Sequence, residues 1–211
     1  MADTNIIPFG AAIVGDVLSA FSLPGGNTIG VIATNALAKK RRESAEILIR
    51  EISSGRHGQI EFDAEDIDPL IDIILRFSKA VAEGAARENL ILLAQIIAGL
   101  KKFRAFEADK FRRWSKIVED LTRDELLVVG IACRLERQRP ADRNDNFSND
   151  LRAAIKHAGY NDRELEALLM SVGATGLLSS ASAFGGLAYE PTAWLAELGQ
   201  LADLEAAAAK K

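Results

Sequence analysis

The chain has 211 residues, of which 48% are hydrophobic and 27% are charged, values that are ordinary for a globular protein. A chain of this length buries enough surface to fold without a metal or disulfide staple, and its single cysteine excludes an intramolecular disulfide. The net charge of -4 excludes the binding of polyanions through bulk positive charge, and the many Ala, Leu and Ile residues favour helices.

The N-terminal region predicts two apolar helices joined by a tight turn. Residues 10–22 indicate a short helix, and Pro24-Gly25-Gly26 indicates the turn that ends it. Asn27 or Thr28 is expected to cap a second helix that runs to about residue 52. No basic segment precedes the apolar run, so it does not predict a signal peptide, and we expect a cytoplasmic bacterial protein.

The sequence of this region does not decide whether lipid or protein surrounds it. No charged residue lies between positions 17 and 38, and the four cations of Lys39-Lys40-Arg41-Arg42 follow directly. Such a segment is long enough to span a bilayer, with the cations as a cytoplasmic flank, but Pro24 and the glycines beside it disfavour a span. Residues 6–37 therefore predict a membrane span, a reversible peripheral contact with a membrane, or a helical hairpin buried by protein.

An acidic connector follows over residues 53–66, with a short extended piece expected at Gln59–Phe62. Residues 61–72 carry six acidic side chains and no cation, and the candidate contacts for a basic partner are Glu61, Asp63, Glu65 and Asp66. Their order lacks the central glycine of a calcium loop, so no metal site is predicted. Acidic residues ahead of a helix are also explained by the helix dipole alone.

The middle of the chain predicts the core. Apolar residues recur from Pro69 to Leu100, with Asp66 or Asp68 as the expected cap and Gly84 as the expected break. The second half of this pattern is apolar on almost every side, which is typical of a central helix. Asn89 interrupts it, and we expect its side chain to be buried and hydrogen-bonded.

Residues 101–116 combine cations with aromatic rings. The cations are Lys101, Lys102, Arg104, Lys110, Arg112, Arg113 and Lys116. Phosphate contacts and base stacking would let this segment bind single-stranded nucleic acid, and the same cations would also suit an acidic partner. A simpler interpretation is that Phe111 and Trp114, three positions apart, form one buried face of a helix over residues 106–119. The cations would then lie in solvent or pair with the acidic connector.

The last third predicts shorter elements. Thr122 followed three residues later by Glu125 indicates a capping box and a helix to about residue 138. Further elements are expected over residues 147–158 (helix), from Asn161 or Asp162 to Gly173 (helix), 175–182 and 187–190 (strands), and from Pro191 into the Ala-rich tail (helix).

Residues 161–195, NDRELEALLMSVGATGLLSSASAFGGLAYEPTAWL, resemble the later part of a winged helix-turn-helix. The resemblance covers roughly residues 120–200, with the helix over 122–138 as the first helix. The carboxylates that follow Asn161, and the absence of a cation at the wing tip, favour protein docking over DNA reading. The whole layout is also similar to bacterial abortive-infection proteins of the Abi-alpha type, which implies a role in conflict between bacteria and phage.

No pattern predicts catalysis, a cofactor or a metal ion. His57, His157 and Cys133 lie far apart in the sequence, and Cys133 falls within an apolar helix, where it is expected to be a small buried hydrophobe.

We therefore predict a mainly α protein, with an apolar helical hairpin and a multi-helix bundle over residues 1–120. A winged-helix-like domain with a small β-hairpin and an Ala-rich tail is predicted over residues 121–211. The predicted function is a non-enzymatic interaction or regulatory protein that binds a protein partner or itself as a homo-oligomer. The alternatives are a nucleic-acid-binding regulator that uses residues 101–116 or the winged helix, and a membrane-acting effector that uses the N-terminal hairpin.

Overall fold

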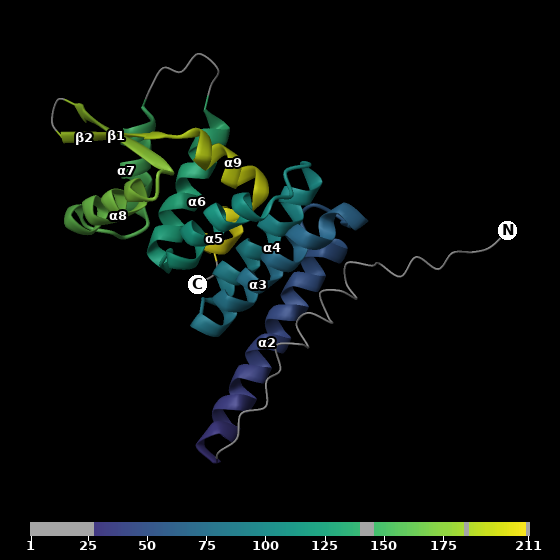
Figure 1. Ribbon diagram of the computed structural model, residues 1–211. Coiled ribbons are helices and arrows are strands. Elements are labelled where there is room, and N and C mark those ends of the chain that lie inside the picture. The colour runs from purple at the N-terminus through teal and green to yellow at the C-terminus, as the bar shows by residue number, and fades with distance from the viewer. Residues whose placement is uncertain (1–27, 140–145, 184–185, 210–211) are drawn as a thin grey trace. The chain divides into compact units, whose positions relative to one another are not determined.

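A computed structural model describes residues 28–139, 146–183 and 186–209 (Figure 1). The predicted helix over residues 10–22, the turn at Pro24 and a cap at Asn27 lie outside these ranges. The described residues are mainly helical with one small antiparallel hairpin, which confirms the predicted fold class. None of the described helices has the length and apolar character that crossing a bilayer requires. The chain divides into two compact units, residues 1–120 (unit 1) and 121–211 (unit 2).

Unit 1 is built around a helix that is buried on almost every side. Its described elements are α2 (Thr28–Ser54), the 3-10 turn η1 (Ala64–Asp66), α3 (Ile67–Glu83), α4 (Arg87–Lys102) and α5 (Ala108–Asp120). α4 is buried continuously from Leu92 to Leu100, and α2, α3 and α5 all pack against it. The predicted central helix is therefore confirmed.

Local signals explain where the helices of unit 1 begin and end. Gly84 adopts a left-handed conformation with a φ of 91° and ends α3, as the sequence predicts. Asp66 occupies the N-cap position of α3, as predicted, but its side chain makes no capping hydrogen bond, because the carboxylate accepts from the Asp63 backbone N–H at 2.6 Å instead. Residues 59–62, where a short extended piece is predicted, form neither a helix nor a paired strand.

Unit 2 places a two-stranded hairpin among short helices. Its described elements are α6 (Arg123–Gln138), α7 (Phe147–His157), α8 (Asp162–Ala174), β1 (Leu178–Ala183), β2 (Gly186–Pro191), α9 (Ala193–Leu201) and α10 (Leu204–Ala209). The capping box of α6 is confirmed, because the Thr122 and Glu125 backbone N–H groups each donate to the other residue's side chain, at 2.7 and 3.3 Å. Asn161 caps α8 by accepting from the Arg163 and Glu164 N–H groups at 3.0 and 3.1 Å.

Two predicted boundaries in unit 2 are wrong. Gly173 does not end α8, and a β-carbon at this position would contact the Tyr189 ring at 3.6 Å. The left-handed turn falls instead at Gly176, which has a φ of 80°. The final helix does not run unbroken into the tail, because the extended backbone of Ala202 separates α9 from α10.

Candidate interaction surfaces

The acidic connector and the first predicted cation meet in the structure. The Lys101 ammonium lies 2.5 Å from an Asp66 carboxylate oxygen and 2.9 Å from one of Asp63. Burial lowers the pKa of Lys101, but the hydrogen bonds that its ammonium donates to the Asp66 and Asp63 carboxylates outweigh this effect, so the pKa lies above its usual value of 10.5. This contact ties η1 to the end of α4. Of the four predicted acidic contacts, Glu61 and Glu65 are exposed and lie outside this ion pair.

The cations of α5 lie along the solvent side of a buried aromatic face. Phe111 and Trp114 are fully buried, which confirms the simpler of the two interpretations and leaves neither ring face open to a base. Three of the cations have local contacts: Lys110 with Glu107 at 3.0 Å, Arg112 with Asp109 at 2.8 Å, and Arg113 over the Trp114 ring at 4.6 Å. Lys116 is exposed.

A different aromatic ring is exposed, at the end of α4. Phe103 has 53% of its surface exposed, and its ring lies edge-on to the His57 ring with centroids 5.8 Å apart. Lys102 and Arg104 flank it, and both are exposed. We refer to Lys102, Phe103, Arg104 and His57 as the α4-end patch.

The backbone that presents this patch is strained. The Arg104 N–H donates to the Lys101 carbonyl at 3.1 Å, and the Ala105 N–H donates to the Leu100 carbonyl at 2.8 Å, which together form a Schellman motif. The left-handed residue of this motif is usually glycine, but here it is Arg104, with a φ of 56°. Strained residues held at one position are a recurrent property of functional sites. No sequence signal predicts this feature, because the glycine that usually marks the end of a helix is absent from residues 101–105.

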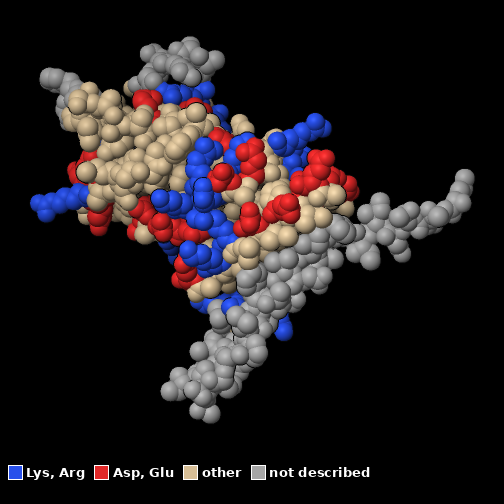
Figure 2. Space-filling model, viewed as in Figure 1, with Lys and Arg blue, Asp and Glu red and all other residues tan. Residues whose placement is uncertain are grey.

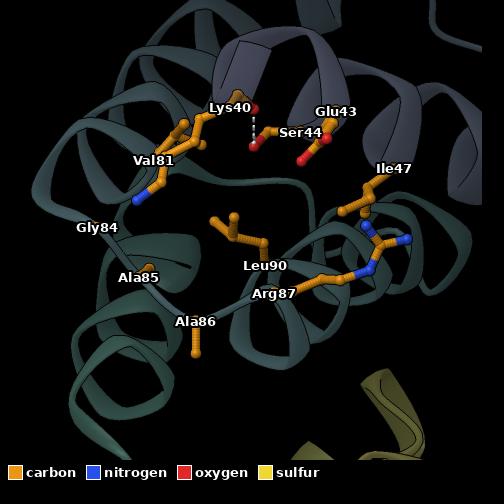
Figure 3. Close-up of a pocket in the computed structure, with 10 residues that line it drawn as sticks. All are labelled: Lys40, Glu43, Ser44, Ile47, Val81, Gly84, Ala85, Ala86, Arg87 and Leu90. Carbon is orange, nitrogen blue, oxygen red and sulfur yellow. Dashed lines mark hydrogen bonds between the residues drawn. The ribbon is translucent and has the colours of Figure 1, made fainter. Parts of the chain in front are cut away.

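A groove opens where α2 meets the loop between α3 and α4, with a volume of about 280 Å³ (Figure 3). Ile47, Val81 and Leu90 are buried residues that line it, whereas Lys40, Glu43 and Arg87 contribute charges of both signs. Figure 3 shows the Leu90 side chain pointing into the groove from α4.

The polar groups of this groove are arranged for packing and not for chemistry. The hydroxyl of Ser44 donates to the Lys40 carbonyl at 2.7 Å, one turn back in α2. A hydroxyl bonded to its own helix has no adjacent base to activate it as a nucleophile. The mixed charges of Lys40, Glu43 and Arg87 also offer no surface of one sign to an ionic ligand.

Unit 2 contains a second groove, of about 250 Å³, between α6, α7 and the start of α10. Arg134, His157 and Glu205 line it together with apolar residues of α6. Cys133 lies elsewhere, buried against α9 with its Sγ 3.8 Å from the Leu195 carbonyl oxygen, which confirms its predicted role as a small hydrophobe. Within the ranges that the structure describes, no three His, Cys, Asp or Glu side chains gather as a metal site would require.

The carboxylates near the start of α8 are bound within unit 2. Asp162 pairs with Lys156 at 2.6 Å, and Glu166 pairs with Arg152. Arg152 also donates to the Leu187 carbonyl at 2.9 Å, so that one side chain joins α7, α8 and β2. The contacts of Arg152 give Glu166 a structural role.

Charges of both signs are mixed on the face that Figure 2 shows. Figure 2 shows acidic side chains beside basic ones on the viewed face. A partner would therefore recognise a local group of side chains more readily than a broad surface of one charge.

Comparison with known proteins gives no relative: no protein-family model, no curated protein and no solved structure matches this chain. The order of three helices, a hairpin and two helices is observed in the described part of unit 2, but the resemblance to a winged helix-turn-helix stays a prediction. The resemblance to abortive-infection proteins stays a prediction as well.

Proposed function

We propose that this protein acts by binding a protein partner through the α4-end patch and not by catalysis. The observation that supports it is an exposed phenylalanine beside an arginine in a left-handed conformation. A folded chain gains nothing in stability from either feature, since burying Phe103 or placing glycine at position 104 would be more favourable. A binding role accounts for both.

The chemistry of the patch indicates the partner. Aromatic and arginine side chains are enriched among the groups that contribute most to protein interfaces, because aromatic rings bury a large surface and the guanidinium group donates several hydrogen bonds. Lys102 and Arg104 lie on either side of Phe103, so an acidic segment with an apolar residue between its carboxylates would match all three side chains. Lys101 adds no free charge, because Asp63 and Asp66 hold its ammonium.

Affinity capture with matched variants tests this proposal. The full chain, Phe103→Ala and Arg104→Glu would be immobilised in parallel and exposed to bacterial extract. Met170→Ala is the matched control, because Met170 is 62% exposed and lies in unit 2. We expect the same protein to be retained by the natural chain and by the control, and to be lost from both patch variants. Equal retention by all four forms would overturn the proposal.

A second candidate function uses the same side chains. An exposed ring between two cations also suits single-stranded nucleic acid, with a base stacked on Phe103 and phosphates at Lys102 and Arg104. Fluorescence anisotropy with labelled oligothymidine and oligouridine tests it. Two phosphate contacts predict a slope of about -1.4 for log K against log salt. The absence of binding at low salt would remove this candidate.

A membrane-acting role through residues 6–37 stays a prediction, because most of that segment lies outside the described residues. A role in conflict between bacteria and phage stays one too. Vesicle co-sedimentation of the full chain, with and without anionic lipid, would test the membrane contact.

A further inference from the structure

We propose that the outer edge of β1 pairs with β1 of a second copy of this chain, so that two hairpins form one antiparallel sheet. This self-association surface lies in unit 2. It is independent of the α4-end patch, and so it goes beyond the proposed function.

The hydrogen bonds of the hairpin show which backbone groups of β1 point outward. The Tyr189 N–H in β2 donates to the Ser148 hydroxyl of α7 at 3.1 Å. Ser180 is opposite Tyr189 in the register. Because Tyr189 directs its N–H away from β1, Ser180 and Tyr189 form a non-hydrogen-bonded pair of the ladder. The Ser180 N–H and C=O therefore point away from β2.

A second hydrogen bond supports the same pattern. The Thr192 N–H donates to the Leu177 carbonyl at 3.1 Å, one position beyond the paired ends of the two strands. Hydrogen-bonded and non-hydrogen-bonded pairs alternate in an antiparallel ladder, so Leu177, Ser179 and Ala181 face β2. Ser180 and Ser182 are the residues whose backbone groups face outward.

The two edges of the hairpin differ. The edge of β2 is covered by α7, through the Ser148 contact. Along β1, residues 179–182 are exposed, and among the described residues no hydrogen bond reaches the backbone of Ser180 or Ser182. Proteins usually protect such an edge with lysine, proline or a bulge, but Leu178–Ala183 contains only leucine, serine and alanine. β1 is therefore an open template for a further strand.

The sequence of β1 makes a second copy the best-matched occupant. Antiparallel pairing about Ala181 places Ser180 of each chain opposite Ser182 of the other, with Ala181 opposite its own copy. Both Ser pairs are then hydrogen-bonded pairs. The paired residues Ser180, Ala181 and Ser182 carry no charge, so no like charges face each other. Their side chains are also small, so the two strands can approach without a clash. The resulting contact is isologous, as closed dimers require.

Disulfide trapping tests both the contact and its register. In the proposed pairing, the two Ala181 Cα atoms form a non-hydrogen-bonded pair about 4.5 Å apart, which lies within disulfide range. The two Ser180 Cα atoms lie roughly 8 Å apart, beyond that range. Full-length Ala181→Cys and Ser180→Cys would be treated with oxidised glutathione and separated on a non-reducing gel. The natural chain, whose Cys133 is buried, serves as the control.

We expect Ala181→Cys to form a covalent dimer roughly tenfold faster than Ser180→Cys, and the natural chain to stay monomeric on the gel. Light scattering should also show that Ala181→Lys lowers the dimer fraction, because two cations would then face each other. No cross-link, or equal rates for both cysteine variants, would overturn the inference. Neither result affects partner capture by the α4-end patch, so failures of the two proposals are distinguishable.

Discussion

Unit 1 and unit 2 differ in what joins their elements. In unit 1, apolar packing surrounds α4, which is buried along most of its length, and the Asn89 amide adds a hydrogen bond to the Val118 carbonyl of α5 at 2.8 Å. In unit 2, two arginines bridge elements that are distant in sequence. Arg152 reaches Glu166 and Leu187, whereas Arg139 lies 2.9 Å from Glu190 in β2 and 5.5 Å from the Phe147 ring.

The difference follows from the elements themselves. A helix such as α4 satisfies its own backbone, so apolar packing on all sides is sufficient to hold it. A two-stranded hairpin is marginal by itself, because it buries little surface and leaves an edge unpaired. Unit 2 therefore anchors its hairpin with the buried Tyr189 ring and with arginine side chains from the helices. We expect unit 1 to be sensitive to cavities and unit 2 to be sensitive to lost ion pairs.

The largest effect is expected at Leu93, which is fully buried in α4. Leu93→Ala should lower the free energy of unfolding of unit 1 by about 3 kcal/mol, because the surrounding helices cannot close the cavity. Urea unfolding followed by Trp114 fluorescence, in a Trp194→Phe background, measures it. The matched control is Leu75→Ala on α3, where the side chain is 41% exposed. A loss as large at Leu75 would contradict the comparison.

A smaller effect is expected at Arg152, whose side chain is 23% exposed. Arg152→Met keeps the apolar stem and removes the contacts to Glu166 and Leu187, so the hairpin should open more readily by about 1 kcal/mol. Amide hydrogen exchange in β2 measures this opening. Lys156→Met is the control, because Lys156 and Asp162 form an exposed pair that contributes little. Unchanged exchange in Arg152→Met would mean that packing alone anchors the hairpin.

At Arg104 we expect a gain in stability. Arg104→Gly should raise the free energy of unfolding of unit 1 by about 1 kcal/mol, because glycine adopts the left-handed conformation without strain. The same variant should weaken partner capture, which would separate binding from stability at one residue. Lys102→Gly is the control, since Lys102 is the last helical residue of α4 and glycine in place of a helical residue gives no gain in stability. Thermal unfolding of the natural chain and the two variants measures these changes. No gain in stability for Arg104→Gly would contradict the inference that Arg104 is strained.

The smallest effect is a difference in pH dependence between the units. Burial raises the pKa of Glu119 above its usual 4.5, although Arg76 and Ser115 oppose the shift. The folded state therefore binds the Glu119 proton more tightly than the unfolded state does. The resulting stabilisation of the folded state is complete below pH 4.5, and it is lost as the pH rises through the pKa of Glu119 in the folded state. Glu119→Gln should stabilise unit 1 at pH 7.

Glu125 should behave in the opposite way. Burial would raise its pKa, but hydrogen bonds from Ser171 and Thr122 outweigh it and lower the pKa below 4.5. Its contribution is present above pH 4.5 and is lost as the pH falls through the folded pKa. The free energy of unfolding of Glu119→Gln, Glu125→Gln and the natural chain would be measured from pH 3 to 8. The difference between each variant and the natural chain should change with pH in opposite directions for the two residues. A change in the same direction for both variants would contradict the environments inferred for Glu119 and Glu125.

Local signals in the sequence predicted much of the fold. The capping box at Thr122 and the break at Gly84 depend on residues within one turn, and both are confirmed. The boundary expected at Gly173 is wrong because a residue distant in sequence, Tyr189, packs beside that position. The break at Ala202 does have a local marker, because Asp203 caps α10 by accepting a hydrogen bond from the Ala206 N–H at 3.0 Å, and the sequence-based prediction overlooked this cap.

The candidate site was harder to predict than the fold. Phe103, Phe111 and Trp114 lie in the same basic segment, and nothing in their spacing separates the exposed ring from the buried ones. The difference arises because the Schellman motif ends α4 before Phe103 can turn inward, which places that ring beside His57. A left-handed arginine cannot be recognised from sequence, since the pattern of this motif normally shows glycine.

Cys133 is a natural probe of local opening in unit 2. It is the only cysteine in the chain, and its thiol lies under α9, where a β-carbon at Gly199 would be 3.4 Å from the sulfur. A thiol reagent can reach it only when α9 separates from α6, so the rate of labelling reports how often that separation occurs. The natural protein can therefore be timed as it opens, without a substitution or an attached probe.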